Sequence, residues 1–462
     1  MSAPSPRTFV YAVLLPHPTE HRVLVQRDGD GWVLPHWKTT ERHFWAAADY
    51  VNRTVRERLG VEVTTLRCLP HDPEPADGPI RRTYDLENHS PHWQPPADAR
   101  WAGLDDLDRL RLIIPEHRDA LARGFADAAS DTIPPQRVPW ARRGWFAEAV
   151  GWIRAQISGL GLQPAGPVEQ ERVWSISCIL RAPTSTGDLY LKASPGFFTA
   201  EPVITRYLAR RFPAHISELV AVEEGQSWLL MRDFGRTRLD HIPEISWWEE
   251  AVRLMARLQL ACVDRTNEML AVGFLDRRLP VLAGQIEPLL SYVASTGRTA
   301  RGALNDAELE TLVGGAPRLR AMCADLAAVP IPATLEHGDY HAGNVVLQRD
   351  HLLIYDWSDG CVAHPFFALL PFLTFRSEQL PGGPEAHARL IRGYLEAWTD
   401  FAPMDRLQKA FELSQTLAAL HQAVSYYRIL TGVEPDALWE WETDLPYFLR
   451  MVVSRLNQQG EI

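Results

Sequence analysis

The chain has 462 residues and a formal net charge of −11, with 46% hydrophobic and 23% charged residues. This length is too great for a single core, so two or three domains are expected. The acidic balance argues against a nucleic-acid-binding protein, because neutralising phosphates requires a basic face. It is compatible with a cationic or neutral small substrate.

Five cysteines are scattered along the chain, and none forms a C-x-x-C pair. This usage indicates a reducing cytosol and argues against a zinc site or a disulfide framework. The apolar run at 9–15 is short and is typical of a first strand, not of a signal peptide. No stretch approaches the ~20 apolar residues of a membrane span. We therefore expect a cytoplasmic protein without nucleic-acid or membrane partners.

The first quarter of the chain alternates short strands with two helices. Apolar residues from Phe44 to Leu59 recur at helical spacing, and Gly60 ends that helix. The expected elements are strands at 8–15, 22–27 and 61–66, a helix at 44–59, a loop around one short strand at 70–98, and a helix near 115–128.

Three prolines at 129–143 indicate a linker. A small lobe is expected next, and after residue 240 the chain is mostly helical. The one exception is a hairpin, in which 345–347 pairs with 352–355. The elements of the small lobe are a helix at 145–157, strands at 172–182 and 188–193, a helix at 200–211, and strands at 218–223 and 227–231.

The segment from Leu335 to Gly360 carries the chemistry. It contains Asp339, then Asn344 five positions later, then Asp356 after the hairpin. Antiparallel strands of similar length bring Asp356 back beside Asn344. Phosphoryl transfer requires a group that accepts the proton of the acceptor hydroxyl and oxygen ligands for a divalent metal, and this pattern supplies both. The alternative interpretation is a set of loop-capping polar residues, since Asp, Asn and Gly favour turns.

The order His337-Gly338-Asp339, Asn344 and Asp356-Trp357-Ser358-Asp359 resembles the aminoglycoside phosphotransferase and choline kinase group of small-molecule kinases. The resemblance implies that Asp339 is the catalytic base and that Asn344 and Asp356 are Mg²⁺ ligands, with ATP as donor. His337 would brace the loop, and His341 and Asp359 would lie nearby. Many members carry an Asp-Leu pair shortly after the metal Asp. Here the run at 364–369 is His-Pro-Phe-Phe-Ala-Leu, so the brace must come from elsewhere.

A kinase-like fold also needs a strand lysine for the phosphates and a helix glutamate that binds this lysine. Lys192 lies in the expected strand at 188–193, and Glu201 opens the expected helix at 200–211. Lysine occurs at only three positions in a chain that otherwise uses arginine, and a compact ammonium suits a point contact to phosphate. The alternative for Lys192 is a solvated edge residue.

The phosphate-covering loop is expected at 174–177, where Ser175 and Ser177 stand in place of glycines and could reach phosphate. They are equally compatible with neutral turn serines. The sequence Asp-Phe-Gly at 233–235 precedes the catalytic loop, so we interpret it as a connector. Candidates for lining an acceptor pocket, each more typical of packing, are His421, Tyr426, Tyr427 and Trp439.

Residues 8–128 resemble a Nudix domain in their order of strands and helix. Of the motif that defines the Nudix helix, Arg53, Glu57 and Gly60 are present. Three of the four glutamates are replaced, one of them by Arg58. Because one glutamate beside an arginine cannot replace the carboxylate cluster that binds Mg²⁺, we predict a domain without hydrolase activity, used for packing, recognition or regulation. A chance match by an unrelated α/β domain is the alternative.

The predicted fold is therefore mixed α/β: a protein-kinase-like two-lobe fold with a largely helical C-lobe, preceded by a Nudix-like α/β/α domain. The predicted boundaries are 1–128 for the Nudix-like domain, 129–143 for the linker, 144–238 for the N-lobe and 239–462 for the C-lobe. The leading hypothesis is an ATP-dependent kinase of a small-molecule hydroxyl. A non-catalytic nucleotide-binding regulator and a nucleoside-diphosphate hydrolase are the competing hypotheses. The sequence does not identify the acceptor.

Overall fold

The computed structural model describes residues 7–70, 78–129, 133–296, 302–375 and 377–458, and its contacts divide the chain into two compact units. The first unit is Met1–Gly196 with Val433–Trp439, and the second is Phe197–Gly432 with Glu440–Ile462. Residues 71–77 of the expected loop and 130–132 of the expected linker lie outside the described residues. The predicted domain boundaries remain predictions, because a compact unit can hold more than one domain.

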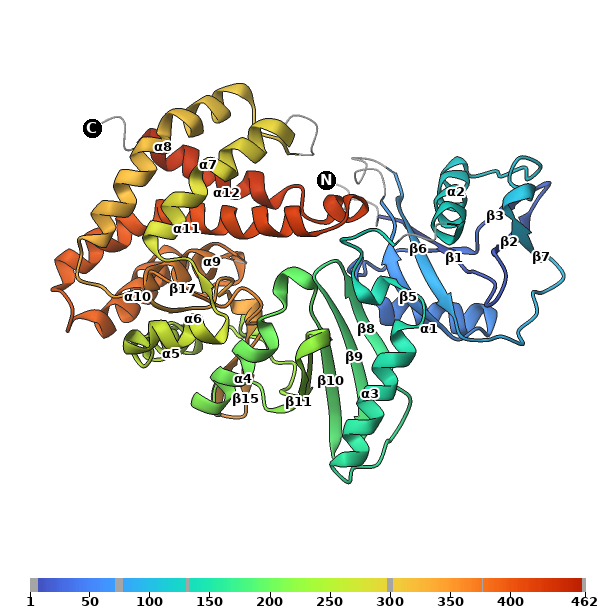
Figure 1. The fold of residues 1–462 in the computed structure, drawn as a ribbon, viewed down its shortest axis with the longest axis horizontal. Helices are drawn as coiled ribbons and strands as arrows, with labels where there is room; N and C mark the ends of the chain where they lie inside the picture. The colour runs from blue at the N-terminus through green and yellow to red at the C-terminus, as the bar shows by residue number, and fades with distance from the viewer. Residues whose placement is uncertain (1–6, 71–77, 130–132, 297–301, 376, 459–462) are drawn as a thin grey trace. The chain divides into compact units, whose positions relative to one another are not determined.

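The first unit begins with two sheets, visible in blue in Figure 1. In the larger sheet the strand Phe9–Leu14 pairs antiparallel with His36–Thr39 on one side and parallel with Ile80–Asn88 on the other. Its strands, in spatial order, are β4 (His36–Thr39), β1 (Phe9–Leu14), β6 (Ile80–Asn88) and β5 (Val63–Cys68). The antiparallel second sheet has the order β3 (Gly31–Val33), β2 (Arg22–Asp28) and β7 (Ala99–Gly103).

Strand β1 is buried along its whole length, because a helix covers each of its faces. Tyr11 and Val13 belong to the core under α1 (Ala48–Leu59), whereas Ala12 and Leu14 belong to the core under α2 (Pro115–Ala129). Successive strand side chains point to opposite faces, so the continuous apolar run is what a sheet covered on both sides requires. The helix begins at Ala48, not at Phe44, and Gly60 ends it with a left-handed φ of 69°.

The region 70–98 differs from the sequence prediction. The one strand expected there, β6, is nine residues long and not short, and β7 follows at 99–103, where no strand was predicted. The length of β6 was underestimated because polar residues alternate with buried ones along it. This alternation is the period of a strand with one face toward solvent.

Three antiparallel strands complete the first unit, with α3 (Trp145–Gly159) preceding them. They are β8 (Glu169–Trp174), β9 (Ser177–Thr184) and β10 (Gly187–Ala193). The single strand predicted at 172–182 is thus a hairpin that turns at 175–176. Gln170 of β8 is buried, and its amide bonds both the N–H and the C=O of Thr65 at 2.8 Å. The amide of Asn52 donates to the same side chain at 3.0 Å, so these strands pack on the amino-terminal sheets.

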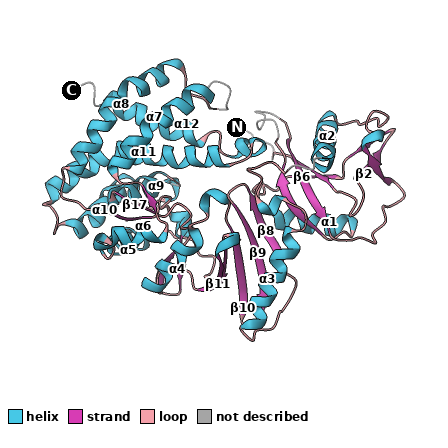
Figure 2. Cartoon of the chain, in the orientation of Figure 1, coloured by secondary structure: helices cyan, strands magenta, loops and turns pink. Residues whose placement is uncertain are grey.

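Helices make up most of the second unit, as predicted for the chain after residue 240 (Figure 2). The antiparallel pair β11 (Leu219–Glu223) and β12 (Trp228–Arg232) follows α4 (Glu201–Arg211). Helix α11 packs most extensively against α12, and its residues from Ser414 to Ser425 are buried on every side. The remaining helices are α5 (Ile245–Leu260), α6 (Thr266–Val272), α7 (Leu279–Thr296), α8 (Asp306–Ala327), α9 (Leu369–Thr374), α10 (Gly383–Leu395), α11 (Met404–Gly432) and α12 (Asp444–Gln458).

Two small sheets lie among these helices. One consists of β13 (Leu275–Asp276), β17 (Cys361–Ala363) and β14 (Thr334–Glu336). The other is the predicted hairpin, β15 (Val345–Gln348) with β16 (His351–Ile354), whose register pairs Val345 with Ile354. None of the helices in the described ranges has the length and apolarity needed to traverse a lipid bilayer.

Candidate active site

The candidate catalytic segment, residues 335–360, begins on the buried strand β14 and includes the hairpin and the residues after it. The hairpin register places Asn344 and Tyr355 side by side, and the Tyr355 N–H donates to the Asn344 carbonyl at 3.1 Å. Asp356 therefore follows directly after a residue that is bonded to Asn344. This confirms the hairpin geometry predicted from the two strand lengths.

Asp339 is a partly exposed carboxylate beside a buried amide. Its side chain is 35% exposed, whereas Asn344 is buried. The Nδ2 of Asn344 donates to the Asp339 main-chain oxygen at 3.0 Å and to its Oδ2 at 3.3 Å. Because the amide nitrogen is committed to Asp339, Oδ1 of Asn344 is the atom that a metal ion could use. One side chain thus orients the candidate base and retains an oxygen ligand.

His337 connects the Asp339 loop to the end of the hairpin. Its Nε2 lies 3.0 Å from the Tyr355 carbonyl, and its Nδ1 lies 3.3 Å from the Asp339 N–H. A carbonyl needs a donor and an N–H needs an acceptor, so these partners fix the tautomer with the proton on Nε2. Burial lowers the pKa of His337, which favours this neutral form. These bonds join the loop to the hairpin, and the bracing role that the resemblance implies for His337 remains a prediction.

Asp356 has a backbone conformation that is unusual for a residue with a side chain. Its φ is 65°, in the left-handed region. Such a conformation persists only where surrounding contacts determine it, and it is enriched at functional sites. The Ser358 hydroxyl donates to Oδ1 of Asp356 at 2.9 Å, which orients the carboxylate. His337 experiences the negative charges of both Asp339 and Asp356, so the two carboxylates lie within electrostatic reach of one imidazole.

The two other polar residues expected near the loop also lie there. His341 accepts a hydrogen bond from the Gly343 N–H at 3.0 Å through Nδ1, and its Nε2 is 3.5 Å from Oδ2 of Asp339. Burial, followed by the charge of Asp339, raises the pKa of Asp359 to about 7. The catalytic loop therefore has a second carboxyl beside it whose ionisation is opposed by its surroundings.

The donor set fits Mg²⁺ held together with phosphate oxygens. Within the described ranges, no three or more His, Cys, Asp or Glu side chains form a group that could hold a metal alone. One carboxylate and one amide oxygen are what a nucleotide-bound Mg²⁺ requires, because that ion keeps waters and takes its other ligands from substrate phosphates. The resemblance noted in the sequence implies that Asp356 supplies the carboxylate and Asn344 the amide oxygen.

The brace of the catalytic loop was not predicted. Gly338 has a φ of +83°, and an added Cβ would lie 2.5 Å from the Asp359 carbonyl oxygen. Its carbonyl accepts a hydrogen bond from Nε2 of Gln422, a buried residue of α11, at 2.7 Å. Its N–H lies 3.3 Å from Oε1 of Glu336. Gln422 is 84 positions away from Gly338, and no local sequence pattern links the two.

Glu336 is a buried carboxyl that favours its protonated form. Burial raises its pKa to about 8, although hydrogen bonds from Gly338 and Gln259 oppose this shift. The Gln259 amide donates to Oε2 of Glu336 at 3.1 Å and is in turn bonded by the Tyr394 hydroxyl. This polar network lies under β14, and the neutral form of Glu336 avoids burying an uncompensated charge.

The predicted nucleotide-side residues lie on the expected elements. Lys192 is buried on β10, opposite Ile179 of β9, and Glu201 is the buried first residue of α4. Ser175 is in the two-residue turn between β8 and β9, and Ser177 opens β9, where its hydroxyl accepts from the Trp174 indole. Lys192 belongs to the first unit and Glu201 to the second. The pairing of these two side chains remains a prediction.

The four candidates for an acceptor pocket differ in their surroundings. His421 is buried, and burial lowers its pKa to about 3. Tyr427 packs on Tyr292 with ring centroids 5.0 Å apart. Trp439 belongs to the first unit, where it contacts Trp45. Tyr426 lies within electrostatic range of Asp444, Asp339 and Asp359. A lining role for each remains a prediction.

Comparison with protein families gives one match. Residues 199–408, somewhat under half of the chain, match the family described as the phosphotransferase enzyme family, APH. The match spans α4 and the whole catalytic segment. No curated protein matches the chain.

Solved structures show the fold. Choline kinase from Cryptosporidium parvum Iowa II has a TM-score of 0.50 at 10% identity, and the match covers 68% of this chain and 95% of that one. A macrolide 2'-phosphotransferase type I has a TM-score of 0.47 at 15% identity, covering 66% and 97%. A spectinomycin phosphotransferase, in complex with ADP and spectinomycin, has a TM-score of 0.42 at 10% identity, covering 68% and 98%. The predicted kinase-like fold, with its helical C-terminal part, is confirmed.

Proposed function

We propose that this protein is an ATP-dependent kinase that transfers a phosphoryl group to a hydroxyl of a small molecule. The observation that carries the proposal is the geometry of 335–360. An accessible carboxylate, Asp339, is oriented by Asn344, and the hairpin returns Asp356 to the same place. The family match over 199–408 and the fold of choline kinase support it.

Asp339 accepts the proton of the acceptor hydroxyl as that oxygen attacks the terminal phosphorus of ATP, and the bond from this phosphorus to the bridging oxygen breaks so that ADP leaves. Asn344 keeps the carboxylate in place through its Nδ2. His337 couples the position of Asp339 to that of the residue before Asp356. Asn344 and Asp356 would hold Mg²⁺, which neutralises charge on the phosphates when bound. Lys192, supported by Glu201, would contact the other phosphates, with Ser175 and Ser177 near them.

The test is mass spectrometry of small-molecule extracts incubated with the protein, ATP and Mg²⁺. New species heavier by one phosphate are expected with the wild type and with Asp350→Asn. The side chain of Asp350 is 95% exposed at the hairpin turn, so this variant makes the same chemical change outside the site. Asp356→Asn should give no such species. Product formation by Asp356→Asn at the wild-type rate would refute the assignment.

A non-catalytic nucleotide-binding regulator is the second candidate. The β8–β9 turn favours it, because Ser175 and Ile176 provide no glycine for close approach of the backbone to phosphate. Nucleotide binding without a phosphorylated product from any acceptor would support this function.

The amino-terminal domain is proposed to have a Nudix-like fold without hydrolase activity. On α1, Glu57 and Arg58 are both exposed, and Arg53 lies 3.8 Å from Asp49. Pyrophosphate-bond cleavage by the full-length protein that survives Asp339→Asn but is lost in Glu57→Gln would overturn this proposal.

A further inference from the structure

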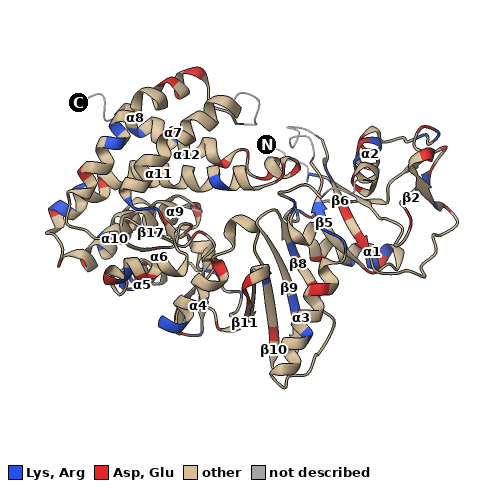
Figure 3. Ribbon diagram, viewed as in Figure 1, with Lys and Arg blue, Asp and Glu red and all other residues tan. Residues whose placement is uncertain are grey.

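A short segment between the last two helices belongs to the opposite unit from its neighbours. Residues 433–439, which we call the acidic loop, join α11 to α12. The loop belongs to the first unit, whereas both helices belong to the second. From Val433 to Asp444 the chain has five acidic residues and no basic one, and Figure 3 shows this run in red.

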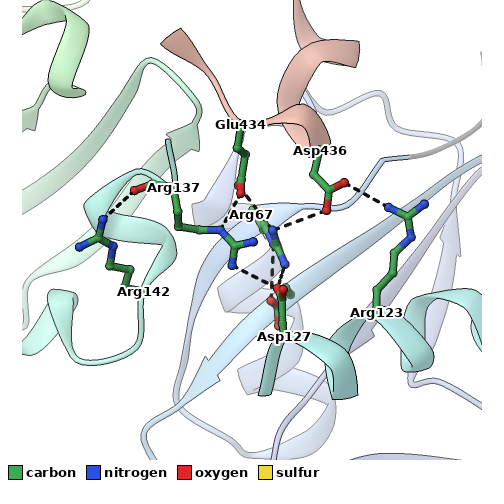
Figure 4. Close-up of polar contacts among 8 residues, drawn as sticks. Arg67, Arg123, Asp127, Arg137, Arg142, Glu434 and Asp436 are labelled. Atoms are coloured by element: carbon green, nitrogen blue, oxygen red, sulfur yellow. Dashed lines mark hydrogen bonds and ion pairs between the residues drawn. The ribbon is translucent and has the colours of Figure 1, made fainter. Parts of the chain in front are cut away.

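The acidic loop is bound by arginines of the amino-terminal part of the chain (Figure 4). Glu434 accepts from Nε of Arg137 at 2.7 Å and from Nη1 of Arg67 at 3.5 Å. Asp436 lies 3.4 Å from Arg123 and 3.9 Å from Arg67. The loop thus uses both of its carboxylates on the amino-terminal domain.

The central ion pairs are largely removed from solvent. The side chains of Arg67 and Arg137 are each 11% exposed, and that of Glu434 is 9% exposed. Asp127 of α2 closes the cluster by contacting both arginines. Buried charges of this kind are costly unless every one is compensated, so Glu434 is required for the balance of the cluster. Trp439 adds an aromatic contact to Trp45, with centroids 4.8 Å apart.

Both helices that leave the acidic loop reach the catalytic loop inside the second unit. Helix α11 carries Gln422, which donates to the Gly338 carbonyl. Helix α12 carries Phe448, whose ring packs on Phe375 with centroids 5.5 Å apart, and Phe375 packs on His341 of the catalytic loop at 5.7 Å. Its first residue, Asp444, also experiences the charge of Asp339. A shift at either end of the loop would therefore be transmitted to residues beside the candidate base.

We propose that the amino-terminal domain positions the acceptor side of the kinase by holding the acidic loop through Arg67 and Arg137. That these helices serve the acceptor rests on the function proposed above. The mechanical link, by which the amino-terminal domain holds α11 and α12 through the acidic loop, does not depend on that function. The domain then contributes no reacting group. Glu434 and Arg137 are positioning residues that fix where α11 ends and α12 begins, and with them Gln422 and Asp444.

Two variants of one ionic cluster test the link. Glu434→Gln removes the carboxylate on the loop, and Asp127→Asn removes the one on α2 that contacts the same two arginines. Both are made in the full-length protein and compared by hydrogen exchange. We expect amides at 426–432 and 445–449 to exchange at least ~5-fold faster in Glu434→Gln and at the wild-type rate in Asp127→Asn.

Equal exchange in wild type and in folded Glu434→Gln would overturn the proposal, and so would equal acceleration by both variants. If Glu434→Gln does not fold, Glu434→Asp, which keeps the charge and shortens the side chain, replaces it with the same criteria.

A kinetic readout separates this inference from the proposed function. With an acceptor identified, Glu434→Gln should raise KM for the acceptor at least ~3-fold and leave KM for ATP unchanged, as expected for lost ground-state positioning. An equal rise in both constants would contradict positioning of the acceptor side. If no acceptor is ever phosphorylated, the proposed function fails while the exchange experiment still decides the mechanical link.

Discussion

The catalytic segment and the acidic loop solve the burial of charge in opposite ways. Around Asp339 the buried titratable groups favour neutral forms, as in His337 and Glu336, and backbone groups supply many of their partners. Around Glu434 the groups are charged, and each charge faces an opposite one. The first arrangement surrounds the partly exposed candidate base with neutral groups, whereas the second joins distant parts of the chain.

This contrast predicts different consequences when one partner is removed. When a partner is removed from the neutral network around Asp339, the remaining groups lose their orientation, so kcat should fall more than the free energy of unfolding. When a partner is removed from the ionic cluster around Glu434, a buried charge is left uncompensated, so the free energy of unfolding should fall more than kcat. The following changes are arranged to test this division.

The largest effect is expected for Asp339→Asn. Replacing the base with an amide of the same shape removes the proton acceptor and should lower kcat by about 10²–10⁴-fold. The thermal midpoint should remain close to that of wild type, because Asp339 is partly exposed. Phosphorylation is followed with a saturating acceptor, and Asp350→Asn is the control on the same hairpin. A kcat within about threefold of wild type would remove Asp339 from the chemistry, since even a weak base contributes more than that.

In the ionic cluster, Arg137→Gln should lower the free energy of unfolding by about 3–5 kcal/mol, because it leaves Glu434 buried with fewer opposite charges. Arg123→Gln is the matched control. Its guanidinium pairs with Asp436, and both side chains are about half exposed, so the expected loss is under ~1 kcal/mol. Urea unfolding measures both. Equal losses in the two variants would show that burial does not distinguish the two pairs.

The pH dependence of stability should distinguish the neutral network. Because the folded-state pKa of Glu336 is raised from 4.5 to about 8, the folded protein keeps a proton that the unfolded chain has lost. The free energy of unfolding therefore falls as pH rises between 4.5 and 8, by at most about 1.4 kcal/mol per pH unit from this group. Asp359 and Asp444, with pKa values raised to about 7 and about 6, add to the same slope over narrower windows.

Glu336→Gln should remove the contribution of this one titrating group from the slope of unfolding free energy against pH. The variant should be more stable than wild type at pH 8. Urea unfolding at half-unit pH steps measures it, with the exposed Glu385→Gln as control. A slope identical to that of wild type would show that Glu336 is ionised in the folded protein.

The distance along the chain between partners decides what the sequence could predict. Asp339 and Asn344 are five positions apart, and His337 and the Tyr355 carbonyl are 18 apart. A turn and a hairpin bring partners at such short separations together, which is why the spacing predicted Asp356 beside Asn344. Glu434 lies 297 positions from Arg137 and 367 from Arg67. From sequence alone, a run of acidic residues is interpreted as solvent-exposed surface. No local sequence pattern indicates that arginines so far along the chain bind it.

The two-residue turn at 175–176 lies within the loop expected at 174–177, but the strand before this loop was not separated from the run predicted at 172–182. The residues from Arg172 to Ala182 combine β-branched, aromatic and polar side chains without a glycine, so the composition does not show where the first strand ends. Strand β7 was missed because it pairs with β2, more than 70 positions earlier, and has little alternation of its own.

The brace of the catalytic loop yields the smallest and most discriminating prediction. Gln422→Ala leaves the buried Gly338 carbonyl without its donor, which should cost about 1–3 kcal/mol in stability. If the bond also orients Asp339, which is the next residue, kcat should fall by about tenfold while KM for ATP stays unchanged.

Gln415→Ala is the control, because Gln415 is a buried glutamine of the same helix whose amide contacts Ser414 instead. It should cost stability without changing kcat. A matched loss of stability in the two variants with no difference in kcat would mean that α11 merely packs against the catalytic loop. A loss of kcat confined to Gln422→Ala would show that the helix orients it, and the Asp-Leu brace that the sequence lacks would then have its replacement on a helix that ends at the acidic loop.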